Sequence, residues 1–153
     1  MPEVLANTVQ VHPFRRRGGD VEHLVLKRSP TDDLYPGLWQ VITGSIEPGE
    51  ISVEAARREL LEEAGASTLH WFALPQPALF YFEPTDRIIL APVFACELTS
   101  DCEPTLSDEH TEHAWLQLAE ALDRLVFPAH LLGVRQTESL LQADDLQTYR
   151  ITL

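Results

Sequence analysis

The chain has 153 residues and carries 24 acidic against 11 basic side chains, so its formal net charge is −13. This length suits one domain with a proper core, and an apolar fraction of 44% argues against disorder. The negative charge argues against broad contact with nucleic acid or an anionic membrane, because both are polyanions. A small anionic substrate stays compatible, since a bound metal ion can reverse the local field.

Features tied to the cellular compartment point to a cytoplasmic protein. No apolar run approaches the roughly 20 residues of a membrane helix, and Met1–Val4 shows no basic segment leading into an apolar one, as a secretory signal would. The two cysteines, Cys96 and Cys102, are too few for a disulfide framework and lack further zinc ligands nearby, so we expect reduced thiols. No linker divides the chain, and we expect one domain over residues 1–153.

Strands and loops are predicted in the first third of the chain. Residues 4–11 and 21–26 are apolar with β-branched side chains and predict two strands of a hairpin. A polar turn from Arg15 to Asp20 would join them, with its three arginines in water or, alternatively, forming an anion site. Prolines and glycines predict loops at 29–37 and 44–50, around a short strand at 38–43.

A helix is predicted over residues 52–64, with Ser52 as N-cap, Glu54 near the positive end of the dipole and Gly65 as the stop. The remaining pattern predicts one long strand at 87–98, other strands at 69–74, 78–82 and 112–116, and helices at 118–125 and 129–141. This order of elements is typical of a mixed α and β fold.

Three glutamates gather on one flank of the predicted central helix. At about 100° per residue, Glu59, Glu62 and Glu63 fall together beside an apolar stripe. Like charges at this spacing destabilise a helix by a few tenths of a kcal/mol per pair. A divalent cation among the oxygens would offset that repulsion, and hard oxygen ligands suit Mg²⁺ or Mn²⁺. The alternative is a solvated acidic face.

The residues around these glutamates form a longer motif. It reads Gly44, five residues, Glu50, seven residues, Arg58-Glu59-Leu60, one residue, Glu62-Glu63, one residue and Gly65. Arg58 could pair with Glu50 or with Glu62 and hold the carboxylates in place. Over residues 44–66 the motif resembles the Nudix box, with Ala66 as the one departure, at a position that packs rather than reacts. The approach to it, at residues 24–28, 36–39 and Thr43, is also similar to many Nudix hydrolases.

The resemblance implies an α+β fold, the Nudix α/β/α sandwich, with a mixed β-sheet between helices. It also implies hydrolysis of a pyrophosphate linkage with Mg²⁺ or Mn²⁺ as cofactor. Glu59, Glu62 and Glu63 would then bind metal, together with the carbonyl of Gly44. Arg58 would orient the glutamates, and Glu50 would anchor Arg58.

A late carboxylate is expected from the loop at residues 107–110, which resembles that of the bacterial dihydroneopterin triphosphate pyrophosphatases. Glu109 is the candidate metal ligand or general base, with Asp108 and Glu112 as substitutes and an ordinary acidic turn as the alternative. His110 and His113 could form a separate transition-metal site, but we favour polar surface for both.

Candidate substrate contacts lie outside the motif. Arg28, at a strand end, is a candidate for binding phosphate, and Thr43 could donate to a phosphate or a base. Trp39, Phe80 and Tyr81 could stack on a base, although a core position is favoured for each.

The sequence thus predicts an enzyme that hydrolyses a nucleoside or pterin triphosphate to a monophosphate and pyrophosphate. A hydrolase of dinucleoside polyphosphates or nucleotide sugars is one alternative, and a silent nucleotide-binding domain is another. The expected partner is a nucleotide-like di- or triphosphate, with no nucleic acid and no membrane. A homodimer is also compatible with the sequence.

Overall fold

The first hairpin forms the centre of the large sheet in this computed structural model, which describes residues 1–152. Strands β2 (Thr8–Arg17) and β3 (Asp20–Arg28) pair antiparallel next to a turn made by Gly18 and Gly19 alone, both at positive φ. The expected polar turn from Arg15 to Asp20 is therefore wrong, because both strands continue to the two glycines.

Arg15 is consequently a buried residue, only 3% exposed. Its Nε donates to Glu22 Oε1 at 2.8 Å, and its guanidinium carbon lies 4.0 Å from the ring centroid of Trp115. An ion pair and a cation–π contact thus compensate the burial of this charge.

The two strands of the hairpin diverge away from the turn, and the next segment fills the gap between them. Strand β5 (Ile42–Ser45) pairs antiparallel with the first half of β2, whereas β4 (Trp39–Gln40) pairs with the last half of β3. The single strand expected at 38–43 is thus two short strands with different partners. This insertion places Gln40 and Gly44 in the middle of the sheet.

The large sheet is mixed. Its order is β10-β3-β2-β9-β6-β11, where β9 (Val93–Leu98) runs parallel to β2 and the other neighbours are antiparallel. The bounds of its outer strands are β10 (His110–Leu116), β6 (Thr68–Ala73) and β11 (Arg150–Ile151). Strand β10 begins two residues earlier than expected, and β11 has no counterpart in the sequence analysis.

A second, three-stranded sheet has the order β1-β8-β7, from β1 (Glu3–Leu5), β8 (Arg87–Ala91) and β7 (Ala78–Phe82). The expected strands at 4–11 and 87–98 are each divided between the two sheets. The second divides at Pro92, which has no N–H for a ladder hydrogen bond. Phe80 and Tyr81 are exposed on β7, so the core position favoured for them is wrong.

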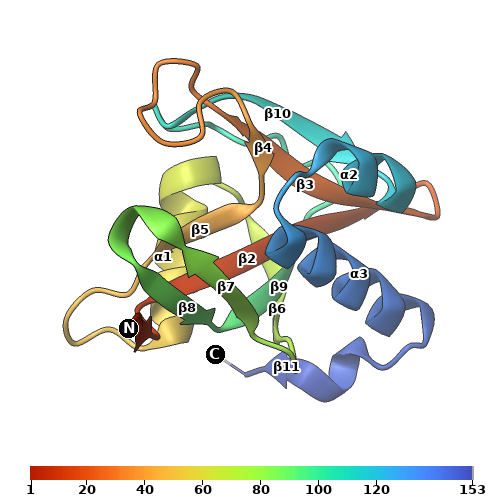
Figure 1. Cartoon of the computed structure of the whole chain (residues 1–153). Helices are drawn as coiled ribbons and strands as arrows, with labels where there is room; N and C mark the ends of the chain where they lie inside the picture. Colours follow the sequence, from red (N-terminus) through yellow and green to blue (C-terminus); the bar gives the residue numbers. More distant parts are fainter. Residues whose placement is uncertain (153) are drawn as a thin grey trace.

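Helices cover both faces of the large sheet (Figure 1). Helix α1 (Ser52–Ala64) packs on one face through Ala56, Leu60 and Ala64, against Leu24, Leu26 and other core side chains. On the opposite face, α2 (Leu118–Arg124) and α3 (Pro128–Gln142) pack against Val25 and Val41. Neighbouring residues of β3 thus alternate between the two cores. The expected α+β fold, a mixed sheet between helices, is confirmed.

Helix α1 spans residues 52–64 as predicted and ends at Gly65, whose φ is 54°. Its N-cap, however, is Ile51 rather than Ser52, and Glu54 Oε2 accepts the Ile51 N–H at 3.2 Å. Glu54, the third residue of the helix, therefore supplies the side-chain acceptor at this end in place of the expected Ser52.

Within residues 1–152, no helix combines the length and apolar character needed to span a bilayer. Cys96 and Cys102 are buried free thiols in the core beneath α1.

Candidate active site

Helix α1 carries two buried carboxylates and one exposed carboxylate beside the face that packs on the sheet. Glu59 and Glu63 are 8% and 5% exposed, whereas the side chain of Glu62 is 56% exposed. The alternative of a solvated acidic face therefore describes Glu62 alone. Burial of Glu59 and Glu63 requires compensating contacts, because an unpaired buried charge is strongly unfavourable.

Gly44 on β5 provides the space that Glu59 occupies. A Cβ at this position would lie 1.9 Å from Glu59 Cδ and 2.2 Å from Glu59 Oε1. The backbone φ of Gly44 is not positive, so glycine is required here by the close approach of the carboxylate and not by the turn.

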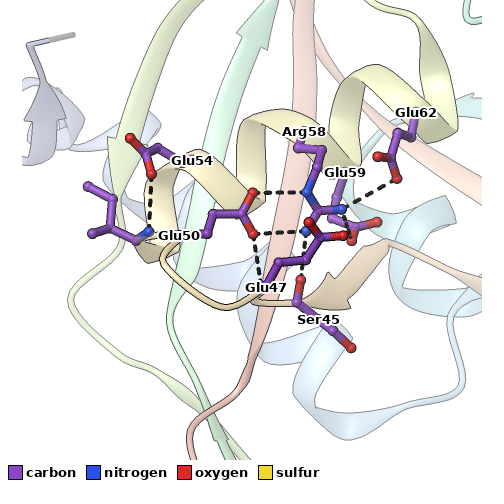
Figure 2. A network of polar contacts seen from close by, with 8 residues as sticks. Ser45, Glu47, Glu50, Glu54, Arg58, Glu59 and Glu62 are labelled. Carbon is purple, nitrogen blue, oxygen red and sulfur yellow. Dashed lines mark hydrogen bonds and ion pairs between the residues drawn. The ribbon is translucent and has the colours of Figure 1, made fainter.

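Arg58 lies between α1 and the loop at residues 45–50 (Figure 2). Its Nε and Nη2 donate to the two oxygens of Glu50 at 2.9 and 3.0 Å, and Nη2 also donates to the Ser45 carbonyl at 2.8 Å. Nη1 donates to Glu59 Oε1 at 2.7 Å and lies 3.4 Å from Glu62 Oε2. Both partners expected for Arg58 are therefore present, with Glu50 held by a two-pronged contact.

Charge and burial act on these carboxylates in opposite directions. The hydrogen bond from Arg58 lowers the pKa of Glu50 below its usual value. Desolvation raises the pKa of Glu59 and outweighs its own hydrogen bond with Arg58. Arg58 therefore fixes the position of Glu59 without fully compensating its burial.

A second group of side chains meets Glu63 from β10 and the loop before it. One ligand atom from each of Glu63, Glu109 and His110 lies within 4.8 Å of the others. The neighbouring carboxyl group of Glu63 is the main cause that raises the pKa of Glu109. The structure therefore brings the late acid Glu109 to the helix glutamates.

His110 is not the surface residue that we favoured. Its side chain is fully buried, with Nδ1 2.9 Å from Glu63 Oε2 and Nε2 2.8 Å from Gln40 Nε2. The strand predicted here begins only at residue 112, which leaves His110 in the loop before it. No signal in the sequence paired His110 with Gln40 or Glu63, because these contacts join three separate elements.

The candidate substrate residues are less closely grouped. Arg28 pairs with His110 in the register of β3 and β10, but its guanidinium holds the 29–37 loop through Asp32 Oδ2 and the Leu34 carbonyl. Thr43 is half-buried beside Gly44. Trp39 packs with the cluster beneath α2 and α3, on the face opposite α1, where Arg124 lies 4.7 Å from its ring centroid.

The arrangement fits a divalent cation. Glu63 Oε2 is buried and has no hydrogen-bond partner within residues 1–152, although burial of such an atom is unfavourable without one. Glu59, Glu63 and Glu109 supply carboxylate oxygens, which are the donors that Mg²⁺ and Mn²⁺ prefer. A cation would also offset the burial and the like charge that raise the pKa values of Glu59 and Glu109.

Two curated relatives resemble this sequence over much of its length. An octanoyltransferase of Myxococcus xanthus is 31% identical over 137 residues, which cover 85% of this chain and 35% of that protein. The nucleoside triphosphatase NudI of an Escherichia coli strain is 28% identical over 109 residues, covering 64% of this chain and 74% of that protein. The chain thus spans about a third of the first relative.

Solved structures share this fold, and a family model matches the sequence. A binary complex of the Caenorhabditis elegans Ap4A hydrolase superimposes with a TM-score of 0.76 at 21% identity, covering 91% of this chain and 99% of that one. The model of the NUDIX domain matches residues 6–134, which include every element of the carboxylate site described above. A match over so much of the sequence places this chain in the NUDIX domain family.

Proposed function

We propose that this chain hydrolyses a pyrophosphate bond in a nucleoside or pterin triphosphate, with Mg²⁺ or Mn²⁺, releasing a monophosphate and pyrophosphate. The observation that carries this proposal is the buried Glu63 oxygen without a hydrogen-bond partner in residues 1–152, next to Glu109 and one helical turn from Glu59. The NudI relatives, which are nucleoside triphosphatases at low identity, favour a triphosphate substrate.

In this proposal Glu59, Glu63 and Glu109 hold the metal with the Gly44 carbonyl, and the exposed Glu62 adds a ligand directly or through water. The metal would neutralise phosphate charge and lower the pKa of bound water. Arg58 keeps the Glu59 carboxylate against Gly44, and Glu50 fixes Arg58. In the alternative role, as general base and not as metal ligand, Glu109 would accept the proton of the attacking water, because Glu63 and burial raise its pKa.

Arg28 and Thr43 are proposed to contact the phosphates, and Trp39 the base. The Arg28 guanidinium already engages Asp32, so a phosphate at this position would compete with that carboxylate. Trp39 would reach a base only from the α2 side of the sheet.

A substrate screen with product identification tests the proposal. Purified protein with Mg²⁺ is incubated with nucleoside triphosphates, dihydroneopterin triphosphate, diadenosine polyphosphates and nucleotide sugars. Turnover of a triphosphate to a monophosphate and pyrophosphate is expected. Turnover of only the last two classes would support a hydrolase of dinucleoside polyphosphates or nucleotide sugars. No turnover of any compound would refute the proposed enzymatic activity.

A variant separates the metal site from the fold. Glu63→Gln should remove most activity while the protein keeps its circular dichroism spectrum and melting temperature, because the amide has nearly the same shape but no charge. Glu112→Gln, on the exposed side of β10, is the matched control and should stay active. Unchanged activity in Glu63→Gln would refute the assignment of Glu63.

A further inference from the structure

A chain of three buried polar side chains leads from the middle of the sheet to the Glu63 carboxylate. Gln40 on β4 contacts His110 on β10 at 2.8 Å between the two Nε2 atoms, and His110 Nδ1 lies 2.9 Å from Glu63 Oε2 on α1. The side chains of His110 and Glu63 are 0% and 7% exposed. Bulk water therefore competes little with these contacts.

The orientation of the Gln40 amide decides which nitrogen of His110 carries the proton. The Gln40 amide nitrogen can only donate, so the His110 Nε2 facing it must accept. A neutral imidazole with an accepting Nε2 carries its proton on Nδ1, the atom that faces Glu63. A carboxylate can only accept, so each contact has one donor and one acceptor.

The contact with Glu63 is close but is not a regular hydrogen bond. His110 Nδ1 lies 2.9 Å from Glu63 Oε2, yet neither atom has a hydrogen-bond partner within residues 1–152. The imidazole thus lies against the buried carboxylate while that oxygen stays free to accept a stronger ligand. A group that orients a metal-binding side chain in this way has the properties of an outer partner in a metal site.

We propose that His110 is a positioning residue for Glu63, with Nδ1, the ring nitrogen that lies against the carboxylate, kept protonated by the hydrogen bond from Gln40 to Nε2. The inference rests on the proposed metal-binding role of Glu63. The opposite tautomer, with the proton on Nε2, would instead present a lone pair of Nδ1 to the site and make His110 a metal ligand itself. That tautomer would overturn the proposal.

Nitrogen NMR of the histidine rings tests the tautomer. In ¹⁵N-labelled protein, with the His110 signals assigned from their loss in His110→Asn, we expect a protonated Nδ1 and an unprotonated Nε2, both without metal and with Mg²⁺. Gln40→Leu, which removes the donor but keeps the size, should abolish this preference. A proton on Nε2 in the wild type, or an unchanged tautomer in Gln40→Leu, contradicts the proposal.

Mn²⁺ binding, followed by the loss of the free-ion signal in electron paramagnetic resonance, tests the positioning role without requiring turnover. Loss of an outer partner typically weakens metal binding about 10–100-fold, and we expect His110→Ala to fall in that range. His110→Asn keeps a donor at the δ position and should recover most of the affinity. His110→Gln carries its amide one bond farther and should not.

Two further comparisons make the outcome decisive. His113, on the same strand with its side chain 30% exposed, provides the matched control, and His113→Asn should bind Mn²⁺ as the wild type does. If His110→Ala does not fold, the difference between the Asn and Gln variants decides, since both are polar amides. Wild-type affinity in His110→Gln overturns the positioning role alone. A wild-type protein that binds no Mn²⁺ refutes the proposed function, and the inference with it.

Discussion

Replacing Gly44 by alanine should disable the site while leaving the fold intact. The added Cβ would lie 1.9 Å from Glu59 Cδ, whereas ordinary contact begins at 3.4 Å, so the carboxylate must move by about 1.5 Å (3.4 − 1.9). The obstructing atom is the end of a flexible side chain, and φ at Gly44 suits an L-residue, so the backbone can accept alanine. The displaced carboxylate would leave its 2.7 Å contact with Arg58.

A misplacement of about 1 Å can reduce a rate about 100-fold, and we expect at least that loss in kcat/KM for Gly44→Ala. The assay combines hydrolysis of the preferred triphosphate, Mn²⁺ titration and thermal unfolding. Ser45→Ala is the control, because the exposed Ser45 contributes only its backbone carbonyl to Arg58. Activity and Mn²⁺ affinity of Gly44→Ala within threefold of the wild type would refute the claim that Glu59 needs the space left by Gly44.

Three other substitutions test separate parts of the structure. Arg58→Lys cannot form the two-pronged contact and should weaken Mn²⁺ binding about tenfold in a titration; full affinity would argue against an orienting role. Burial lowers the pKa of His130 to about 4 from 6.5, so folding favours the neutral ring and stability falls as pH falls from 6.5 to 4. Over this pH range the free energy of unfolding should fall by about 3 kcal/mol. His130→Asn, which keeps an acceptor for the Val41 N–H, should flatten urea-unfolding stability there, and an unchanged slope would contradict this. Gly133→Ala would place a Cβ 2.0 Å from His12 Nε2 and should lower the free energy of unfolding by about 1–3 kcal/mol, against a helix-propensity gain of up to about 1 kcal/mol; a net stabilisation would be the opposite result.

The central helix and its acidic residues could be predicted because their signals are local. Apolar spacing, the stop at Gly65 and the run of glutamates all lie within one continuous segment, and the helix bounds at 52–64 are confirmed. The ion pair between Arg58 and Glu50 was also foreseeable, since the two side chains lie eight residues apart across one loop. Helical periodicity does not say how deeply a flank is covered. The burial of Glu59 and Glu63 therefore became visible only once the helix was packed on the sheet.

The errors in strand assignment have a common physical origin. An extended strand looks the same in sequence whether it stays in one sheet or passes into another, so the divisions at Pro92 and between β4 and β5 depend on which strands are neighbours. The buried Arg15 shows the same limit. Its charge is compatible with the core only because Glu22 and Trp115 lie against it.

The sequence by itself determined that this chain is acidic, folds into mixed α and β elements and carries a cluster of glutamates suited to a cation. Only the tertiary structure decided how that charge is used. It buries Glu59 against Gly44, brings Glu109 from residues far along the chain, and places His110 and Gln40 behind Glu63. These contacts join α1, β4, β5 and β10, whose proximity follows from strand pairing over long sequence separations and is not encoded in any local pattern.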